Sequence, residues 1–373
     1  MNESRPRLNL TRRDLLKLLA AAGTAAAAGH TLFEYAPWLD YDQQTAHARR
    51  PLEKSAALSA QMRELVRYAT LAASGHNAQP WKFAIREGWI EIHPDFTRRL
   101  PVVDPHDREL WISLGCALEN LLVAARAAGY APEVTYPQAM DFIHVRLTAD
   151  TSHGSSSFDA IPLRQNTRSE YDGQPVQSDV LDQVLSLPLE PGIVLRPVMK
   201  RELETVLEYV QQANVVQYSD RAFLAELNRW LRFNKKEALA SDDGLYLRCL
   251  GKTELPGWLG RMIVAGSKPR QQADADARNL RSSSGALVIA AQGESRSSWV
   301  QTGQVYGRVA LQLTALNIKS AFLNQPIEVA EVRRQFQSAM GLGGTAVELL
   351  VRFGHADPMP RSMRRPVEQV LMS

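Results

Sequence analysis

The sequence has few of the residues that mark several common classes of protein. It holds only two cysteines, Cys116 and Cys249, and neither stands in a CxxC pair or at the spacing of metal ligands. No GxGxxG element follows an expected strand, so no separate dinucleotide-binding domain is indicated. The net charge is only +3, and the basic residues near the N-terminus account for it. The rest of the chain is therefore near neutral, which gives no support for nucleic-acid binding.

The N-terminus has the pattern of an export signal. Basic residues with a pair of arginines, Arg12 and Arg13, precede the apolar, alanine-rich run 18–28. The arginine pair resembles the twin-arginine (Tat) type, so we expect a Tat-type signal peptide over 1–28, a linker over 29–54 and a periplasmic or otherwise exported location. An ordinary alanine-rich helix of the fold and an uncleaved membrane anchor are the alternatives. Export would permit a disulfide, but Cys116 lies in an apolar helical pattern typical of a core residue.

The remaining chain mixes helical and strand patterns, which indicates an α+β protein. A helix is expected from Ala56, and short strands over 82–85 and 89–93 flank a turn at residues 87–88. Asp104 has the position of a helix N-cap, and Gly129 has that of the C-terminal stop. A further strand is expected over 142–147.

This layout occurs a second time. Residues 111–129 align with residues 299–317, so that Trp111 and Gly115 match Trp299 and Gly303. We interpret the match as an internal duplication, although chance similarity of two amphipathic helices is the alternative. The halves are predicted at 55–150 and 161–373, with a lid or insertion at 203–283.

Two polar stretches are candidates for the site. The first, "ASGHNAQPWKF" (residues 73–83), places small and hydrogen-bonding residues between a helix and a strand. Glycine lets a backbone approach a ligand, and an amide side chain offers both a donor and an acceptor. The second, "RQNTRSEY" (residues 164–171), alternates Arg164, Asn166 and Arg168, which an extended segment would place on one face. Two guanidiniums around an amide suit a phosphate, and a solvated charged strand is the alternative.

Together these stretches resemble the nitroreductase family of FMN-dependent oxidoreductases. The first matches the family's small-residue–Asn–x–Gln–Pro–Trp motif. The second is similar to its Arg–x–Ser–x–Arg–x–Phe arm, with Asn166 in place of the serine and Tyr171 near the aromatic position. The C-terminal "GHADPMPRSMRRPVEQVL" resembles the family's basic tail. The sequence is also similar to Tat-exported, Acg-type tandem nitroreductase-like proteins.

The resemblance implies a nitroreductase-like fold and bound FMN. Family dimers build each flavin site from the loop of one subunit and the arm of the other, whereas this chain has one loop and, after it, one arm. The resemblance therefore implies that the two halves of one chain form an intrachain pseudo-dimer that holds one FMN. It also implies that the protein is a monomer rather than an obligate homodimer. The implied cofactor-binding residues are Ser74, Gly75, His76, Asn77 and Gln79 of the loop; Arg164, Asn166 and Arg168 of the arm; Lys319 and Ser320 near the flavin N5 edge; and Arg361 or Arg364 of the tail.

Two of these roles stay open at the sequence level. Gln79 either contacts the flavin or braces the loop. His76 either lines the flavin pocket or acts as an acid, and it has no partners at metal spacing. Because the flavin carries the redox chemistry in this family, no catalytic acid–base residue is predicted.

The resemblance favours an FMN-dependent oxidoreductase that passes electrons from reduced flavin to a small planar acceptor such as a nitroaromatic or a quinone. NAD(P)H is the family's usual donor, but it is doubtful for an exported protein. The first alternative is a flavin-binding or sequestering protein without turnover, and the second is a flavin-free structural or partner-binding protein. The expected partners are a small-molecule acceptor and the Tat export machinery.

Overall fold

The computed structural model describes residues 23, 38–53, 55, 57–137, 139 and 141–372. Apart from Gly23, the predicted signal peptide lies outside the described residues, as do residues 29–37 of the predicted linker. The rest of that linker contains helix α2 (Trp38–Ala48). Tyr41 is 1% exposed, and its ring lies 5.0 Å from that of Tyr246. Residues 38–48 are therefore part of the folded body, and the linker prediction is wrong there because Tyr41 buries its ring.

The first half contains a four-stranded antiparallel sheet in the order β1-β2-β4-β3. Its strands are β1 (Trp81–Arg86), β2 (Trp89–Pro94), β3 (Tyr130–Thr135) and β4 (Ile143–Ala149). The turn between β1 and β2 contains Gly88 with φ +81°, a conformation that glycine adopts without strain. The strands predicted from the alternating pattern are confirmed.

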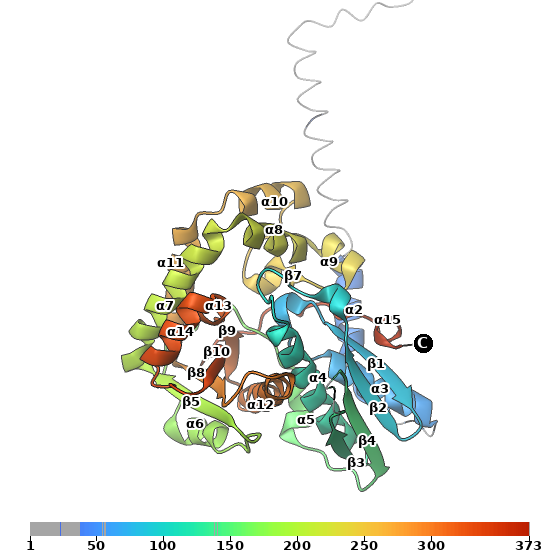
Figure 1. Ribbon diagram of the computed structural model, residues 1–373. Coiled ribbons are helices and arrows are strands. Elements are labelled where there is room, and N and C mark those ends of the chain that lie inside the picture. The colour runs from blue at the N-terminus through green and yellow to red at the C-terminus, as the bar shows by residue number, and fades with distance from the viewer. Residues whose placement is uncertain are drawn as a thin grey trace, which may run out of the picture.

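The second half repeats this arrangement with the order β5-β8-β10-β9 (Figure 1). Its strands are β5 (Ile193–Met199), β8 (Gly285–Ala291), β9 (Lys319–Phe322) and β10 (Ala346–Gly354). In each half, the second strand leads into a 20-residue helix, either α4 (Arg108–Ala127) or α12 (Arg296–Ala315). That helix leads to the edge strand, and the last strand returns between its neighbours. The predicted α+β class is confirmed, and the shared topology supports the interpretation as a duplication.

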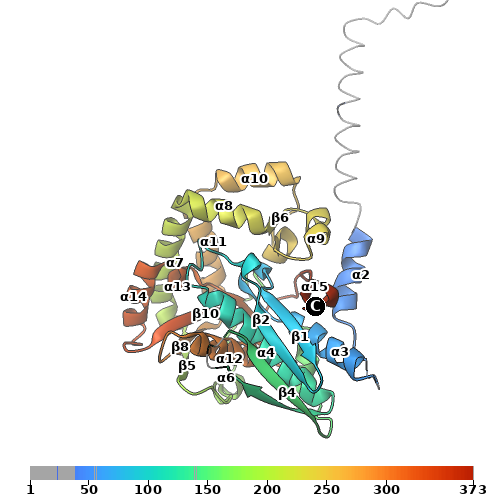
Figure 2. The same ribbon diagram turned by 45° about the vertical axis from the view of Figure 1, so that its right-hand side comes forward.

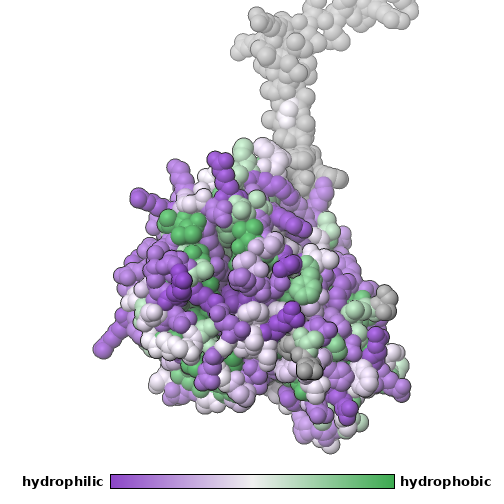
Figure 3. Space-filling view, viewed as in Figure 1, coloured by the Kyte–Doolittle hydropathy of each residue, from purple (hydrophilic) through white to green (hydrophobic). Residues whose placement is uncertain are grey.

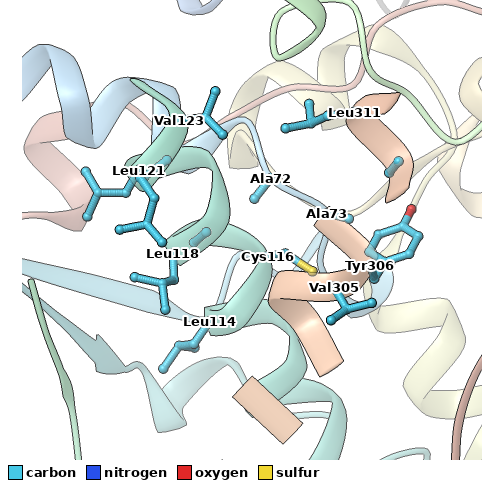
Figure 4. Close-up of a cluster of buried hydrophobic side chains, with 14 of the residues drawn as sticks. Ala72, Ala73, Leu114, Cys116, Leu118, Leu121, Val123, Val305, Tyr306 and Leu311 are labelled. Atoms are coloured by element: carbon cyan, nitrogen blue, oxygen red, sulfur yellow. The ribbon is translucent and has the colours of Figure 1, made fainter. Parts of the chain in front are cut away.

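The helices α4 and α12 cross at the two glycines that the sequence alignment matched. A Cβ atom on Gly115 would lie 2.0 Å from the carbonyl oxygen of Val300, and one on Gly303 would lie 2.0 Å from that of Ile112. The backbones can approach this closely only without side chains at the crossing. Figure 4 shows Cys116 of α4 beside Val305 and Tyr306 of α12, at the centre of the shared core.

Helix α4 is the one helix of the described residues that is long and apolar enough to cross a membrane. Some 89% of its apolar window is buried inside the protein, so it is the core helix of the fold. It begins at Arg108, later than the predicted N-cap Asp104. Asp107 adopts the left-handed conformation at the helix start, and the carboxylate of Asp104 still accepts a 3.0 Å hydrogen bond from the Leu110 N–H.

A helical insertion separates β5 from β8, where the first half has only the β1–β2 turn. Its outer helices, α7 (Lys200–Ser219) and α11 (Pro269–Arg281), pack together and add buried side chains to the core of the second sheet. Residues 221–267 form what we call the cap (Figures 1 and 2). It comprises α8 (Arg221–Trp230), β6 (Leu231–Arg232), α9 (Lys235–Ser241), β7 (Leu245–Tyr246), the 3-10 helix η3 (Leu247–Leu250) and α10 (Gly257–Ala265).

Short elements complete the two halves. They are α3 (Leu58–Thr70), η1 (Gly75–Asn77), η2 (Phe96–Arg98), α5 (Ser156–Ala160), α6 (Ser178–Leu185), α13 (Gln325–Glu328), α14 (Ala330–Ala339) and α15 (Val367–Val370). After β10 the chain returns to the first half, where Leu371 pairs with Phe83 of β1. The arm pairs with the second half, because Asn166 bridges Ser320 of β9. The loop, the arm and the tail therefore converge between the two halves.

Candidate functional site

A cavity of about 990 Å³ lies between the two halves and the cap. Its volume is at the upper end of the usual range of small-molecule sites, about 300–1,000 Å³. Seven parts of the chain form its wall. They are the loop at residues 73–76, the first half of α4, the arm at residues 168–170, the end of α7, the end of β9 with the segment after it, part of β10, and the cap with the adjoining part of α11. The apolar residues of the cap wall are Phe223, Leu227, Leu231, Phe233, Leu245, Leu247, Leu250, Leu255, Ile263 and Val264.

The loop turns sharply as it enters the wall. His76, Asn77 and Gln79 all have positive φ values, between 48° and 53°. The hydroxyl of Ser74 accepts a 3.0 Å hydrogen bond from the Gln79 N–H. The Gly75 N–H donates to the hydroxyl of Ser113 on α4 at 3.3 Å. These bonds explain the run of small polar residues, which fixes a strained turn whose Ser74, Gly75 and His76 line the cavity.

Gln79 braces the loop, which is one of the two roles left open by the sequence. Its side chain is fully buried, and its amide nitrogen donates to the Asp242 carbonyl of the cap at 2.8 Å. Its amide oxygen accepts from the N–H of Arg365 in the tail at 2.9 Å. A contact between Gln79 and flavin is therefore not supported, because its amide already bonds within the protein.

Asn77 also ties the loop to the cap and the tail. Its amide nitrogen donates to the carbonyl oxygens of Gly244 at 3.1 Å and Met363 at 3.3 Å. Its amide oxygen accepts from the guanidinium of Arg364 at 3.0 Å. Within the cap, Gly244 packs closely on the end of α8, since a Cβ there would lie 2.5 Å from the Trp230 carbonyl oxygen. Asn77 does not line the cavity, and its predicted flavin contact stays a prediction.

Two of the predicted site residues, His76 of the first half and Arg168 of the arm, face the cavity from opposite sides. Burial, with a smaller contribution from the Arg168 charge, lowers the pKa of His76 to about 4. The imidazole is therefore neutral at pH 7, which makes it a poor general acid there. Burial also lowers the pKa of Arg168. Among the described residues no side chain forms a hydrogen bond or an ion pair with the Arg168 guanidinium, so it is available to a ligand in the cavity.

Four other arginines form a second group, which we call the arginine cage: Arg49, Arg164, Arg361 and Arg364. Burial, followed by the charges of Arg361 and Arg164, lowers the pKa of Arg49 to about 10. Burial and the charges of Arg49 and Arg164 lower the pKa of Arg364 well below its usual value.

The cage lacks a balancing negative charge. Within the described part of the chain, no carboxylate forms an ion pair with any of the four arginines. The Nε atoms of Arg164 and Arg364 are buried and have no hydrogen-bond acceptor. Buried guanidiniums without a counter-ion are costly to maintain, so this group is suited to a bound anion.

The cage lies next to the cavity. Arg164 donates to the carbonyl oxygen of Leu71 at 2.8 Å, and Arg364 donates to those of Leu71 and Ala72 at 3.3 Å each. The next residue, Ala73, already lines the cavity. Along the arm, Arg168 follows Arg164 by four residues, which in extended chain span about 13 Å. A ligand with an anionic end and a ring end fits this arrangement.

Three predicted residues lie behind the cavity wall. Asn166 accepts a 3.4 Å hydrogen bond from the hydroxyl of Tyr306. The Ser320 carbonyl accepts from the Thr167 N–H at 2.9 Å, and the Lys319 ammonium donates to Asn317 at 2.8 Å. None of the three predicted residues is part of the wall, which begins at the following residue, Ala321. Their predicted contacts with the cofactor remain predictions.

Two carboxyl groups in the wall were not predicted from the sequence. Glu109 of α4 and Glu328 of α13 both line the cavity. Burial, with the charge of Glu328, raises the pKa of Glu109 to about 7, and burial also raises that of Glu328. Glu328 accepts a 2.6 Å hydrogen bond from Gln217, and Glu109 accepts one of 3.3 Å from Asn324. Glu109 lies in the first turn of α4, where acidic residues are common, so only the fold distinguishes it.

Comparisons with known proteins agree with the resemblance seen in the sequence. No protein-family profile matches the chain. "Putative NAD(P)H nitroreductase Rv3131" of Mycobacterium tuberculosis is 26% identical over 323 residues, which are 83% of this chain and 90% of that protein. "Putative NAD(P)H nitroreductase acg" of the same organism is 23% identical over 325 residues, 83% of this chain and 94% of that protein. The resemblance to nitroreductases is therefore confirmed over most of the chain.

Two solved structures overlap with about half of the chain. One is the FMN-dependent nitroreductase NfnB from Mycobacterium smegmatis in complex with NADPH, with 12% identity, a TM-score of 0.37, and coverage of 56% of this chain and 94% of that one. The other is a nitroreductase with bound FMN from Bacteroides fragilis, with 15% identity, a TM-score of 0.36, and coverage of 56% and 95%.

Proposed function

We propose that the protein is an FMN-dependent oxidoreductase of nitroreductase type, with one composite flavin site between its two halves. The observation that carries the proposal is the arginine cage, because Arg164 and Arg364 are buried, Arg49 and Arg361 are half-buried, and no carboxylate of the described residues pairs with any of them. An anion of more than one charge would balance them. A flavin phosphate is such an anion, and it would accept hydrogen bonds from the orphaned Nε atoms of Arg164 and Arg364. The relatives named as nitroreductases support the same assignment.

The cavity would hold the ring end of the cofactor. Ser74, Gly75 and His76 would lie along the ring or the ribityl chain, since they form the wall nearest the cage. Arg168 would then lie at the ring rather than at the phosphate, because it faces the cavity and is separated from the cage by the length of the arm. A cation there stabilises the negative charge that a flavin ring acquires on reduction. The bound cofactor would supply two-electron chemistry, and the chain would supply position and charge.

The chain also offers a proton at the same wall. Burial raises the pKa of Glu109 to about 7, so its carboxyl keeps a proton to higher pH than an ordinary glutamate, and its Oε1 atom contacts the Arg108 guanidinium at 3.1 Å. An ideal Cβ on Gly75 would lie 3.2 Å from the Glu109 Oε2 atom, so this carboxyl is directly behind the loop. We propose that Glu109, with Glu328 beside it, donates the proton that a two-electron reduction of the acceptor requires.

The acceptor would enter against the cap. Ten apolar side chains of the cap face the cavity, which favours a small planar molecule such as a nitroaromatic or a quinone over a highly charged one. The Tat-type signal favours export, for which NAD(P)H is a doubtful electron donor, whereas the relatives named NAD(P)H nitroreductases favour NAD(P)H. The chain would act as a single copy, because both halves of the site are in one polypeptide.

A cover over the cavity also favours a second function, a flavin reservoir without turnover. The cap is tied to the loop by the bonds of Asn77 and Gln79, which would hold it over a bound ligand. Turnover separates the two functions. The purified protein with FMN is reduced by dithionite under anaerobic conditions, and a nitroaromatic or a water-soluble quinone is then added. Rapid reoxidation supports the oxidoreductase, whereas a flavin that stays reduced supports the reservoir. Failure to bind FMN at all contradicts both functions.

A further inference from the structure

Helix α10 carries the two most exposed large apolar side chains of the described residues and a third that is about half exposed. Trp258 is 65% exposed, Met262 is 60% exposed and Ile263 is 51% exposed. Trp258 and Met262 are four residues apart, so they lie one above the other on the same face of the helix. Figure 3 shows hydrophobic residues among polar ones over the upper part of the molecule, where α8 and α10 lie. Exposed apolar patches of this kind mark interaction surfaces.

The charge around α10 fits an anionic lipid surface. From Leu255 to Ala273 the chain contains no acidic residue and three exposed basic ones, Arg261, Lys268 and Arg270. The Arg261 guanidinium also forms a 2.8 Å ion pair with Glu237, so Lys268 and Arg270 provide most of the positive surface. A tryptophan and aliphatic side chains bordered by basic residues are typical of a helix that lies in a membrane interface.

Helix α2, the first described helix, begins at the same end of the protein. The 37 residues before Trp38 include the apolar run 18–28, and they join the body at α2. Helix α2 packs on α9 of the cap, where the ammonium of Lys235 contacts Asp42 at 3.3 Å. Figure 2 shows the cap and the start of α2 at the same end of the molecule. A membrane segment before α2 would therefore hold the cap toward the bilayer.

The mouth of the cavity also lies beside α10. Ile263, Lys268 and Gln271 line the cavity and are exposed as well, so they form its rim. We infer that α10 docks on an anionic lipid bilayer through Trp258, Met262 and Ile263, which brings the mouth of the cavity to the headgroup layer. This docking would let acceptors dissolved in the membrane enter the cavity directly. It does not depend on whether the cavity binds flavin.

The test places a fluorescent label that responds to polarity on residue 262 of the full chain, by Met262→Cys in a Cys249→Ser background. The remaining thiol, Cys116, is buried. A matched control carries the label on residue 189 by Leu189→Cys, because Leu189 is 38% exposed and lies near α6, away from the cap. Trp258→Cys provides a second reporter on α10 if the first variant folds poorly. The probe is a vesicle of equal parts phosphatidylglycerol and phosphatidylcholine.

The inference predicts a blue shift and a brighter emission from residue 262, no shift from residue 189, and a weaker response at high salt. A label at residue 262 that stays in water while the full chain sediments with the vesicles would overturn it, because the N-terminal segment alone would then hold the protein. Equal shifts at both positions would also overturn it. A shift that needs no vesicles and grows with protein concentration would mean that a second copy covers α10 instead.

Discussion

Arg164 tests the proposed phosphate site most cleanly among the cage arginines. Its guanidinium donates a hydrogen bond to the Leu71 carbonyl and interacts with the Tyr306 hydroxyl, and its Nε atom is buried without an acceptor. Arg164→Met keeps a long apolar side chain but removes the charge and all donors. A hydrogen bond between charged partners contributes about 1.5–3 kcal/mol, so the loss of one bond to phosphate weakens FMN binding by about 10- to 150-fold.

The protein without a ligand should respond differently. The variant loses the bond to Leu71, but that carbonyl keeps a 3.3 Å bond from Arg364. Removing one of four like charges also relieves a repulsion, which for a pair about 4 Å apart is about 1 kcal/mol in bulk water and about 4 kcal/mol at an effective dielectric constant of about 20. The two effects oppose each other, so we expect the free energy of unfolding of the apo form to stay the same or to rise.

Riboflavin, which lacks the phosphate, provides the internal control. The dissociation constants of FMN and riboflavin are measured by fluorescence quenching for the parent protein, Arg164→Met, and Arg126→Met, which removes an exposed arginine of α4. Arg164→Met should weaken FMN binding alone, and Arg126→Met should change neither constant. Equal weakening of FMN and riboflavin, or no change in FMN affinity, would refute the assignment of the cage to phosphate.

Three further predictions concern the cavity and its frame. Burial raises the pKa of Glu109 from 4.5 to about 7, so the folded state binds a proton that the unfolded state releases between these values. The free energy of unfolding should therefore fall as pH rises from about 4.5 to 7, and the rate of acceptor reduction should fall above about pH 7. Glu109→Gln should flatten the pH profile of stability, measured with denaturant, and the pH profile of the rate, measured by stopped flow. The exposed control Glu133→Gln should flatten neither profile. Gly303→Ala drives a Cβ against the Ile112 carbonyl, and it should lower the free energy of unfolding by about 1–3 kcal/mol or more, with an unchanged denaturation midpoint as the contrary result. Gly244→Ala should loosen the cap and speed FMN release. Gly173→Ala, which shares the positive φ but has no neighbour within 4 Å, should leave the release rate unchanged. An equal increase of the release rate in both variants would mean that backbone strain alone is responsible.

The sequence predicts the frame well because its signals are local. Alternation gives the strands of the first sheet, and the match of Gly115 with Gly303 indicates a repeated helix, whereas the crossing of the two helices is shown only by the structure. The loop and the arm could be found because short polar residues are rare between a helix and a strand. These parts need no knowledge of distant partners.

The rest of the site depends on contacts between distant residues. Arg49 was missed because it lies in a segment interpreted as a linker, and only the packing of α2 brings it to the cage. The bracing role of Gln79 depends on Asp242 and Arg365, which no local pattern associates with the loop. Glu328 comes beside Glu109 only when the segment after β9 folds against α4.

The absorbance spectrum of the folded protein, purified from the cytoplasm of a host in which export is blocked, tests the central claim most directly. Any chromophore is then released and identified, and its amount is compared with that of the protein. The composite site predicts FMN at about one molecule per chain, and it predicts a substantial loss of this FMN in Arg164→Met. A colourless protein that also fails to take up added FMN would contradict the flavin site, and two FMN molecules per chain would contradict a single site between the halves.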